Sequence, residues 1–571
     1  MPRINKKTLP CYFFNVTYIA DRIIFIERGM IMQIKIVETT PYTDQKMGTA
    51  GLRRKSKVAM QENYVENFVQ SIFDAIGGVK GQTFILGGDG RFYNKIAIQK
   101  IMKMAAAAGM KKMIVGQNGY ISTPTASRVL LKNKADGGFV LTASHNPGGP
   151  NGDFGIKYAI ASGGQCPTSL SDKIYENTKN IKQYAILDAD DVDLSNIGTQ
   201  KLGDMEIEVI DSLKDYIEMM QGIFDFDAIR KLFAGGFSMR FDAMNAVTGP
   251  YALKIFEEIL GAPKGTVVNY VPMEDFGGLH PDPNLIYAKD LVDLMWSDNA
   301  PDFGAANDGD GDRNMILGKK FFVTPSDSLA ILTDNYKLIP GYKNGIYGVA
   351  KSAATSTAVG RVAKALGIGY YEVPTGWKYF CNLMDSNRIT FCGEESFGTG
   401  SSHIREKDGI WAILFWLNII AATGKSVEEI AHDHWKKYGR SYYMRNDYEI
   451  ADTEVANKLM ADLEARLPSL KGKTFGAYTV SEAYPFVYND PVDGSSTKNG
   501  LMVYFTDKSR IVYRLSGTGS VGATLRVYLE RYETEKFDEN VEQMLESLAD
   551  VSREIAEIIK RTGKTKADLL T

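Results

Sequence analysis

The sequence predicts an α/β protein with three similar α/β domains, each built on a mixed sheet, and a smaller C-terminal α+β domain. The chain has 571 residues, which at roughly 150 residues per domain corresponds to about four domains. Short apolar runs, glycine-rich polar turns and helical stretches follow one another repeatedly, as in α/β proteins. After residue 440 a hairpin pattern replaces this rhythm, which indicates a different kind of domain at the end.

Each part of this prediction rests on its own stretch of sequence. Ligands of α/β sheets bind at loops that follow strands, so the polar loops after the apolar runs are the expected site loops. The last domain contains a predicted hairpin whose strands flank residues 506–509. In the third domain, residues 411–422 form an apolar stretch that is too short to span a bilayer, which predicts a buried helix. We predict domains at 32–208, 209–325, 326–439 and 440–571, after an extension, 1–31, to which no structure is assigned. The apolar runs are 84–86, 138–141, 303–306 and 389–392.

Composition excludes several classes of protein. Hydrophobic residues make up 44% and charged residues 24%, which is typical of a globular chain. The 66 Lys and Arg nearly balance the 69 Asp and Glu, so no basic excess attracts nucleic acid or anionic lipid. Four cysteines without a CxxC pair favour a reducing compartment, and we expect a cytoplasmic protein without a membrane span.

The clearest local motif places Asp308, Asp310 and Asp312 at alternate positions with glycines between them. Three carboxylates in one loop require a cation, and oxygen ligands without His or Cys favour Mg²⁺ over Ca²⁺ or Mn²⁺. An EF-hand is excluded, since Arg313 and Lys319 occupy the positions of its invariant Gly and Glu. A solvated acidic turn is the alternative.

Ser144 lies in a polar loop after a predicted strand, where a nucleophile can be presented. His145 could activate it, but neighbouring side chains in an extended loop tend to diverge, and no Gly-x-Ser-x-Gly elbow surrounds the serine. A Ser-His-Asp hydrolase is therefore weakly supported. An ordinary polar loop is the alternative.

Residues 514–520, together with Arg526, combine two arginines, three hydroxyls and two glycines, the composition of a phosphate-binding loop. Gly517, Gly519 and Gly522 match a dinucleotide-binding pattern, but the next residues alternate like a strand and do not open a helix, which excludes that fold. The acidic turn 393–396 contains carboxylates and a hydroxyl that can form hydrogen bonds with sugar hydroxyls. A turn without a binding role is the alternative.

The order and spacing of four motifs resemble those of the α-D-phosphohexomutase family, most closely its eukaryotic-type phosphoglucomutases. The motifs are 142–147, 308–313, 393–396 and 514–519, and the resemblance covers about residues 33–571. It implies four domains around a deep active-site cleft. It also implies that Ser144 carries a phosphoryl group and that Mg²⁺ is held by Asp308, Asp310, Asp312 and a phosphate oxygen on Ser144.

The resemblance implies further site residues in three groups. Those around the transferring phosphoryl group are Arg53, His145, Lys157, Lys407 and Arg313. Those for sugar recognition are Thr375, Gly376, Glu394 and Ser396. Those for the non-reacting phosphate are Arg514, Ser516, Thr518, Gly519 and Arg526.

The activity implied is an isomerase reaction that interconverts glucose 1-phosphate and glucose 6-phosphate through glucose 1,6-bisphosphate. Two alternatives stay open: a mutase that prefers mannose or amino sugars, and a weakly catalytic scaffold protein. The sequence leaves open which of His145, Lys157 and Lys407 is the general base or acid.

Overall fold

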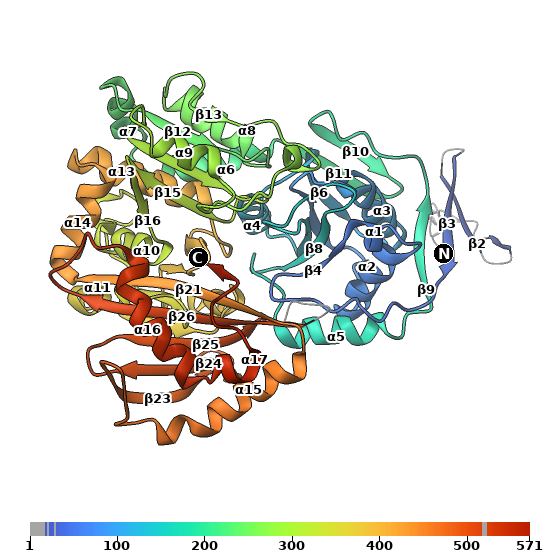
Figure 1. The fold of residues 1–571 in the computed structure, drawn as a ribbon. Helices are drawn as coiled ribbons and strands as arrows, with labels where there is room; N and C mark the ends of the chain where they lie inside the picture. The colour runs from blue at the N-terminus through green and yellow to red at the C-terminus, as the bar shows by residue number, and fades with distance from the viewer. Residues whose placement is uncertain (1–16, 20–21, 28–29, 517–521) are drawn as a thin grey trace, which may run out of the picture.

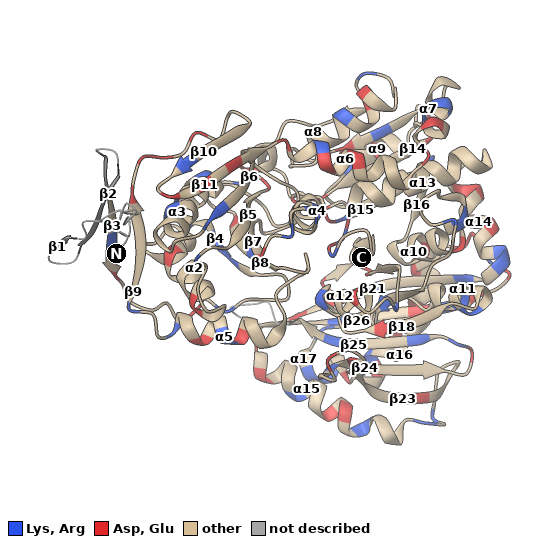
Figure 2. Cartoon of the chain, turned by 180° about the vertical axis from the view of Figure 1, so that it is seen from behind, with Lys and Arg blue, Asp and Glu red and all other residues tan. Residues whose placement is uncertain are grey.

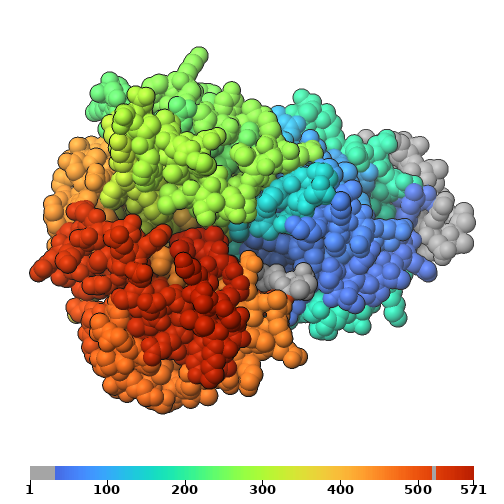
Figure 3. Space-filling view, viewed as in Figure 1, coloured from blue at the N-terminus to red at the C-terminus, as the bar shows by residue number. Residues whose placement is uncertain are grey.

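The computed structural model describes residues 17–19, 22–27, 30–516 and 522–571 of the chain. Figure 1 shows successive parts of the chain, from blue through green and yellow to red, each built around its own sheet. These parts meet near the middle of the face seen in Figure 3. The predicted class, three α/β domains with mixed sheets and a different C-terminal domain, is confirmed.

The first sheet has the strand order β10-β11-β6-β5-β7-β8-β4 and is mixed. Its central strands β5 and β7 pair in parallel and are almost entirely buried, which explains their continuous apolar runs. The loops after parallel strands meet at one edge, so the loops that follow β5 and β7 are neighbours. The strands are β4 (Leu52–Lys55), β5 (Thr83–Gly88), β6 (Lys112–Tyr120), β7 (Gly137–Leu141), β8 (Asp153–Ile160), β10 (Gly198–Leu202) and β11 (Met205–Ile210).

Three helices pack with this sheet in the first domain: α2 (Tyr64–Ala75), α3 (Asn94–Ala107) and α4 (Thr123–Asn133). The helix α4 begins at a Ser122 cap, whose side chain accepts a hydrogen bond from Thr125 N. The sheet runs to the end of β11, past the predicted domain end at residue 208. The other predicted domain boundaries stay predictions.

The second and third sheets are smaller and also mixed. The second has the order β13-β12-β14-β15-β16, and the third β18-β17-β19-β20. In the second, β14 runs parallel to β12 and antiparallel to β15, so the acidic loop is the turn between β14 and β15. The strands are β12 (Met239–Asp242), β13 (Val267–Val268), β14 (Phe303–Asn307), β15 (Asn314–Gly318), β16 (Phe321–Val323), β17 (Gly348–Ser352), β18 (Gly369–Val373), β19 (Phe391–Gly393) and β20 (Thr399–Ser401).

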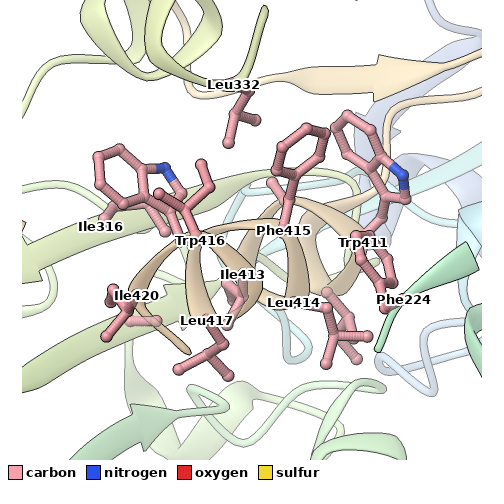
Figure 4. Close-up of a cluster of buried hydrophobic side chains, with 14 of the residues drawn as sticks. Phe224, Ile316, Leu332, Trp411, Ile413, Leu414, Phe415, Trp416, Leu417 and Ile420 are labelled. Atoms are coloured by element: carbon pink, nitrogen blue, oxygen red, sulfur yellow. The ribbon is translucent and has the colours of Figure 1, made fainter. Parts of the chain in front are cut away.

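The helix α13 (Gly409–Thr423) is the buried helix that its apolar sequence predicts. It is apolar on all sides, and Figure 4 shows its side chains surrounded by Phe224, Ile316 and Leu332 from other elements. Its one amide, Asn418, is satisfied by Asp225, which donates through N at 2.8 Å and accepts through O at 3.1 Å. The helix α14 (Val427–Tyr438) follows it with a complete capping box at Ser426.

No single helix in the described ranges is long and apolar enough to cross a membrane; α13 and α14 pass the length and composition test only as a pair bent by 85°.

The fourth sheet is antiparallel where its long strands meet, with the order β22-β23-β24-β25-β26-β21-β27. The predicted hairpin is confirmed as the pairing of β24 with β25. The helices α15 (Thr453–Arg466) and α16 (Val541–Ile555) pack on this sheet. The strands are β21 (Arg440–Ile450), β22 (Thr474–Phe475), β23 (Tyr478–Asn489), β24 (Ser496–Phe505), β25 (Arg510–Ser516), β26 (Ala523–Glu533) and β27 (Leu569–Leu570).

The extension to which the sequence assigned no structure contributes short strands. The strands β1 (Thr17–Ile19) and β2 (Arg22–Glu27) pair with each other, and β2 pairs with β3 (Met30–Glu38). The strand β3 also pairs with β9 (Gln183–Asp188), which joins this sheet to the first domain. Charged residues of both signs are interspersed over the fold in Figure 2, in accordance with the net charge of −3.

Candidate active site

Ser144 lies in the loop after β7 and is 1% exposed. Its φ of 56° is in the left-handed region, which a non-glycine residue adopts only when its surroundings hold it there. Its N–H donates to Thr142 Oγ1 at 2.7 Å, and its carbonyl accepts from Arg91 Nη2 at 2.7 Å. Its Oγ donates to Asp308 Oδ2 at 2.8 Å. The serine hydroxyl is therefore aimed at the acidic loop of the second domain.

The side chains of Ser144 and His145 do not diverge as the sequence suggested. Ser144 Oγ lies 3.3 Å from His145 Nδ1, because the left-handed turn at Ser144 departs from an extended chain. Burial, followed by the positive charges of Arg313 and Arg53, lowers the pKa of His145 well below its usual value. The imidazole is therefore neutral near pH 7.

A buried ion pair supports the serine loop from the neighbouring β5 loop. Arg91 and Asp89 are fully buried and 2.9 Å apart. Besides Ser144 O, the guanidinium donates to the carbonyls of Asn146 at 3.3 Å and Asp153 at 2.9 Å. Sequence reasoning assigned no role to this pair. The signal that could have found it is its place after β5, at the same sheet edge as Ser144.

Asp308, Asp310 and Asp312 are buried together, with one oxygen from each within 4.8 Å of the others. Burial and then the two other aspartates raise the pKa of Asp308 well above its usual value. Asp310 Oδ1 is buried and has no hydrogen-bond partner in the part of the chain that the structure describes. A buried oxygen left over, in an all-oxygen cluster of like charge, fits a hard divalent cation.

Lys157, on β8, is bound to this acidic loop. Its Nζ donates to Asp310 Oδ2 at 2.7 Å, to Asp312 Oδ2 at 3.3 Å and to Thr123 Oγ1 at 3.2 Å. Burial alone would lower the pKa of Lys157, but the two aspartates more than offset this and raise it. Since these three contacts use all three N–H groups, the structure places Lys157 as a partner of the acidic loop, and its catalytic role stays a prediction.

Two arginines lie at the acidic loop, Arg53 from the first domain and Arg313 at the end of the loop itself. Arg53, on β4, is half-buried, and its guanidinium makes no hydrogen bond or ion pair within the described ranges, although Asp310 is among the charges that act on it. Arg313 pairs through Nη1 with Asp282 Oδ1 at 3.0 Å and keeps a buried Nε without a partner among the described residues. Both guanidinium groups retain donors that an anion could accept.

The third domain brings Lys407 and the predicted sugar turn to this site. Lys407 Nζ lies 3.2 Å from Asp312 Oδ1. Glu394 is buried, and its Oε1 accepts a hydrogen bond from Gly376 N at 3.3 Å, so the two predicted sugar segments touch. Thr375 Oγ1 is buried with no partner that the structure describes, and Ser396 lies in the same turn between β19 and β20.

The predicted phosphate clamp lies at one end of the fourth sheet. Arg514 and Arg526 are directly opposite each other on β25 and β26, and Ser516 ends β25. Burial would raise the pKa of Glu395, but Arg514 and hydrogen bonds lower it, so the clamp adjoins the sugar turn. Thr518 and Gly519 lie outside the described residues.

Sequence reasoning also missed Glu406, which precedes Lys407 and is buried. Burial raises the pKa of Glu406 to about 7, although Lys157 opposes this. Its Oε2 accepts from Gln165 Nε2 at 3.0 Å. An acidic residue beside a predicted lysine was the available signal, but such pairs are common on solvated loops.

Comparisons with known families match four successive segments. Residues 44–185, 214–320 and 325–438 match the descriptions "Phosphoglucomutase/phosphomannomutase, alpha/beta/alpha domain" I, II and III. Residues 440–568 match "Phosphoglucomutase-1, C-terminal domain". The four segments together cover most of the chain, in the order in which the domains follow one another.

Individual relatives match over nearly their whole length. The chain is 56% identical to "Phosphoglucomutase" of Rhizobium radiobacter, over 94% of this chain and 100% of the relative. It is 51% identical to "Phosphoglucomutase-1" of Homo sapiens, over 95% and 100%. The solved structure of pp63/parafusin, a phosphoglucomutase from Paramecium in an open form, superimposes with a TM-score of 0.88 at 45% identity, over 94% and 99%. Since likeness of this degree extends through all four domains, the chain belongs to the α-D-phosphohexomutase family and is of the phosphoglucomutase type.

Proposed function

We propose that this protein is a phosphoglucomutase that interconverts glucose 1-phosphate and glucose 6-phosphate by way of a phosphoserine at Ser144. The observation that carries the proposal is the 2.8 Å contact from Ser144 Oγ to Asp308 within a buried group of three carboxylates. A phosphoserine brings nearly two further negative charges, so the arrangement is stable only with a divalent cation between them. Relatives of the chain are named phosphoglucomutases, which does not favour the mannose-preferring mutase or the scaffold.

The chain's own residues position the phosphoryl group. The P–O bond at Ser144 breaks as a new one forms to the free hydroxyl of the sugar phosphate. The hydroxyl proton passes to a base, and Ser144 Oγ, the leaving group, takes up a proton from an acid. The resulting glucose 1,6-bisphosphate reorients within the site and then returns its other phosphate to Ser144. Arg53 and Arg313, which retain free donors, hold the transferring group, since phosphoryl transfer depends mainly on positioning and charge stabilisation.

The cation we propose is Mg²⁺, held by Asp308, Asp310 and Asp312 together with an oxygen of the phosphorylated Ser144. The fit rests on the buried, unpartnered Asp310 Oδ1 and on an all-oxygen ligand set. When bound, the ion neutralises charge on the phosphoryl oxygens. Lys157 and Lys407 hold Asp310 and Asp312 in place from two other domains.

One phosphate-binding clamp binds the non-reacting phosphate in both half-reactions, whether that phosphate is on C1 or on C6 of the sugar. Glu394, Ser396, Thr375 and Gly376 recognise sugar hydroxyls, because a carboxylate and hydroxyls accept and donate hydrogen bonds in fixed directions. Arg514, Ser516 and Arg526, with Thr518 and Gly519, bind the phosphate that does not react. A turn of the sugar between half-reactions exchanges its two phosphates between the clamp and Ser144.

A coupled assay of glucose 1-phosphate conversion, with a catalytic amount of glucose 1,6-bisphosphate, tests the proposal. Ser144→Ala and chelated protein should lose activity, whereas Ser195→Ala, at an exposed serine of the first domain, should keep it. Intact-mass analysis should find one phosphate on the wild type and none on Ser144→Ala. A wild type as inactive as Ser144→Ala would overturn the proposal, and faster turnover of mannose 1-phosphate would overturn its sugar specificity.

We propose a cytoplasmic location, with sugar phosphates as the ligands. The support is that Cys166, Cys381 and Cys392 are free and buried, which suits a reducing compartment. Fractionation of cells that express the full chain tests this, and recovery with an organelle would contradict it.

A further inference from the structure

The loop 402–408 carries Lys407 and joins β20 to α13. The two ends of the loop, which form its base, are joined by a contact of 3.0 Å between His403 Nε2 and Asp408 Oδ2. Asp408 also accepts a hydrogen bond from Tyr216 OH of the second domain at 2.5 Å. These contacts fix the base of the loop within the second and third domains. Arg405, nearer the tip, is also held by the third domain, where its carbonyl accepts from Cys381 Sγ at 3.2 Å and its Nε pairs with Asp385 at 2.5 Å. The side chain of Glu406 makes no hydrogen bond within the third domain among the described residues.

The tip is attached to the first domain by two hydrogen bonds. Arg405 N donates to Ser127 Oγ at 3.0 Å, and Glu406 Oε2 accepts from Gln165 Nε2 at 3.0 Å. The second bond joins two side chains that are well buried, Glu406 at 5% and Gln165 at 9% exposure. Removing one partner of a buried hydrogen bond leaves the other desolvated and unpaired, which costs more than the bond itself contributes.

Little free volume lies beside the contact between Glu406 and Gln165. A cavity of about 20 Å³ adjoins the contact and is lined by Glu406, Gln165, Lys157 and Ser127, among other residues. This volume admits about one water molecule, so the Glu406–Gln165 contact and the Lys157 side chain adjoin a site with little room for solvent. Gln165 Oε1 is buried with no partner among the described residues. A buried amide whose oxygen lacks a hydrogen-bond partner reduces stability. The hydrogen bond from Gln165 Nε2 to Glu406 is therefore not explained by the stability of the first domain alone.

Consecutive side chains of the tip thus contact different domains. Glu406 reaches Gln165 of the first domain, and Lys407 reaches Asp312 of the second at 3.2 Å. The two side chains share a peptide unit, so fixing one limits where the other can point. A displacement of Lys407 by about 1 Å is the kind of change that can cost up to about a hundredfold in rate.

We infer that Glu406 and Gln165 are positioning residues, whose hydrogen bond attaches the tip of loop 402–408 to the first domain and so sets the place of Lys407 against the acidic loop. The inference rests on the proposed function, because the place of Lys407 matters to the rate only if phosphoryl transfer occurs at Ser144. Neither residue is expected to touch the substrate.

Steady-state kinetics of Glu406→Ala, Gln165→Ala, Lys407→Ala and their double variants test the inference. Each of Glu406→Ala and Gln165→Ala should lower kcat by about tenfold or more with little change in KM, and the pair together should lose no more than one alone. Glu406→Ala should have no further effect once Lys407 is alanine. Glu406→Gln, which can still accept from Gln165, should recover most of the rate.

Multiplicative losses, either between Glu406→Ala and Lys407→Ala or between Glu406→Ala and Gln165→Ala, would overturn the inference. The matched control is Gln70→Ala, which removes an exposed amide–carboxylate hydrogen bond to Asp74 in the same domain and should leave kcat unchanged. If Glu406→Ala does not fold, Gln165→Ala with Lys407→Ala gives the same comparison. An inactive wild type would refute the proposed function, whereas multiplicative losses in an active protein would refute only this inference.

Discussion

The substitution Arg91→Met tests how the serine loop is held. The Arg91 guanidinium is fully buried, pairs with Asp89 at 2.9 Å and donates to Ser144 O at 2.7 Å. Removing one partner of a buried ion pair costs about 3–5 kcal/mol, because the other charge is left uncompensated. Burial already raises the pKa of Asp89, so this carboxyl would take up a proton and relieve part of the cost. Ser144 would also lose the donor that holds its left-handed conformation.

Hydrogen exchange and kinetics measure the two effects of Arg91→Met separately. The chain has several domains, so a local opening free energy is more meaningful than one global value. The Ser144 amide, which donates to Thr142 Oγ1, should exchange about a hundredfold faster or more if the loop loses about 3 kcal/mol. We expect kcat to fall by about a hundredfold through misplacement of Ser144.

A second variant separates charge from position. Adding Asp89→Asn to Arg91→Met removes the unpaired charge, so stability should partly return while activity stays low. Arg91→Lys, which keeps the charge but not the planar fork, should lie between wild type and Arg91→Met. Unchanged exchange of the Ser144 amide together with unchanged kcat in Arg91→Met would refute the reasoning.

Four further predictions concern single positions. Gly309→Ala should lower activity by about tenfold or more without unfolding the protein, because its Cβ would meet Ser144 O at 2.5 Å; wild-type rates would contradict this. Asp310→Asn should weaken Mg²⁺ binding by about tenfold or more in calorimetric titration, and an unchanged Kd would exclude Asp310 as a ligand. Burial lowers the pKa of His434 to about 3, so between pH 6.5 and 3 the unfolded chain binds a proton that the folded protein does not. The free energy of unfolding therefore decreases by about 5 kcal/mol in total as the pH is lowered through this range. His434→Leu should therefore move acid unfolding, followed by circular dichroism, to lower pH. At His432 burial would lower the pKa, but the Asp538 partner more than offsets this and raises it. This stabilisation is present below pH 6.5 and lost as pH rises through the folded pKa, so His432→Gln should move acid unfolding to higher pH. A shift to higher pH with His434→Leu would contradict the first assignment, and a shift to lower pH with His432→Gln the second.

Local patterns of sequence predicted the fold class and most of the site loops. Apolar runs such as 138–141 become buried central strands because their composition suits a strand covered on both faces. The acidic loop could be recognised as a candidate cation site because its three carboxylates lie within five consecutive residues. The apolar residues 411–422 predicted a buried helix for the same reason, since a helix that is apolar on all sides has no face suited to water.

Contacts between distant residues could not be predicted in this way. Ser144 and Asp308 are 164 positions apart, and neither loop by itself indicates that their oxygens come within 2.8 Å. Only the family resemblance implied that they share one cation. Sequence reasoning left Lys157 as one of three candidates for the general base or acid, with His145 and Lys407, whereas the structure uses all its donors on Thr123 and the acidic loop. It also treated Ser144 and His145 as side chains of an extended loop, and the left-handed φ of the serine could not be read from the residue type.

The sequence by itself determined the elements, their order and the kinds of chemical group that each loop carries, because strand, turn and helix depend mainly on the spacing of neighbouring side chains. Only the tertiary structure decided which of those groups meet, how deeply they are buried and which donors remain free. These depend on how separate sheets pack against one another, and it is burial that turns ordinary aspartates, lysines and histidines into groups with shifted pKa values and defined partners.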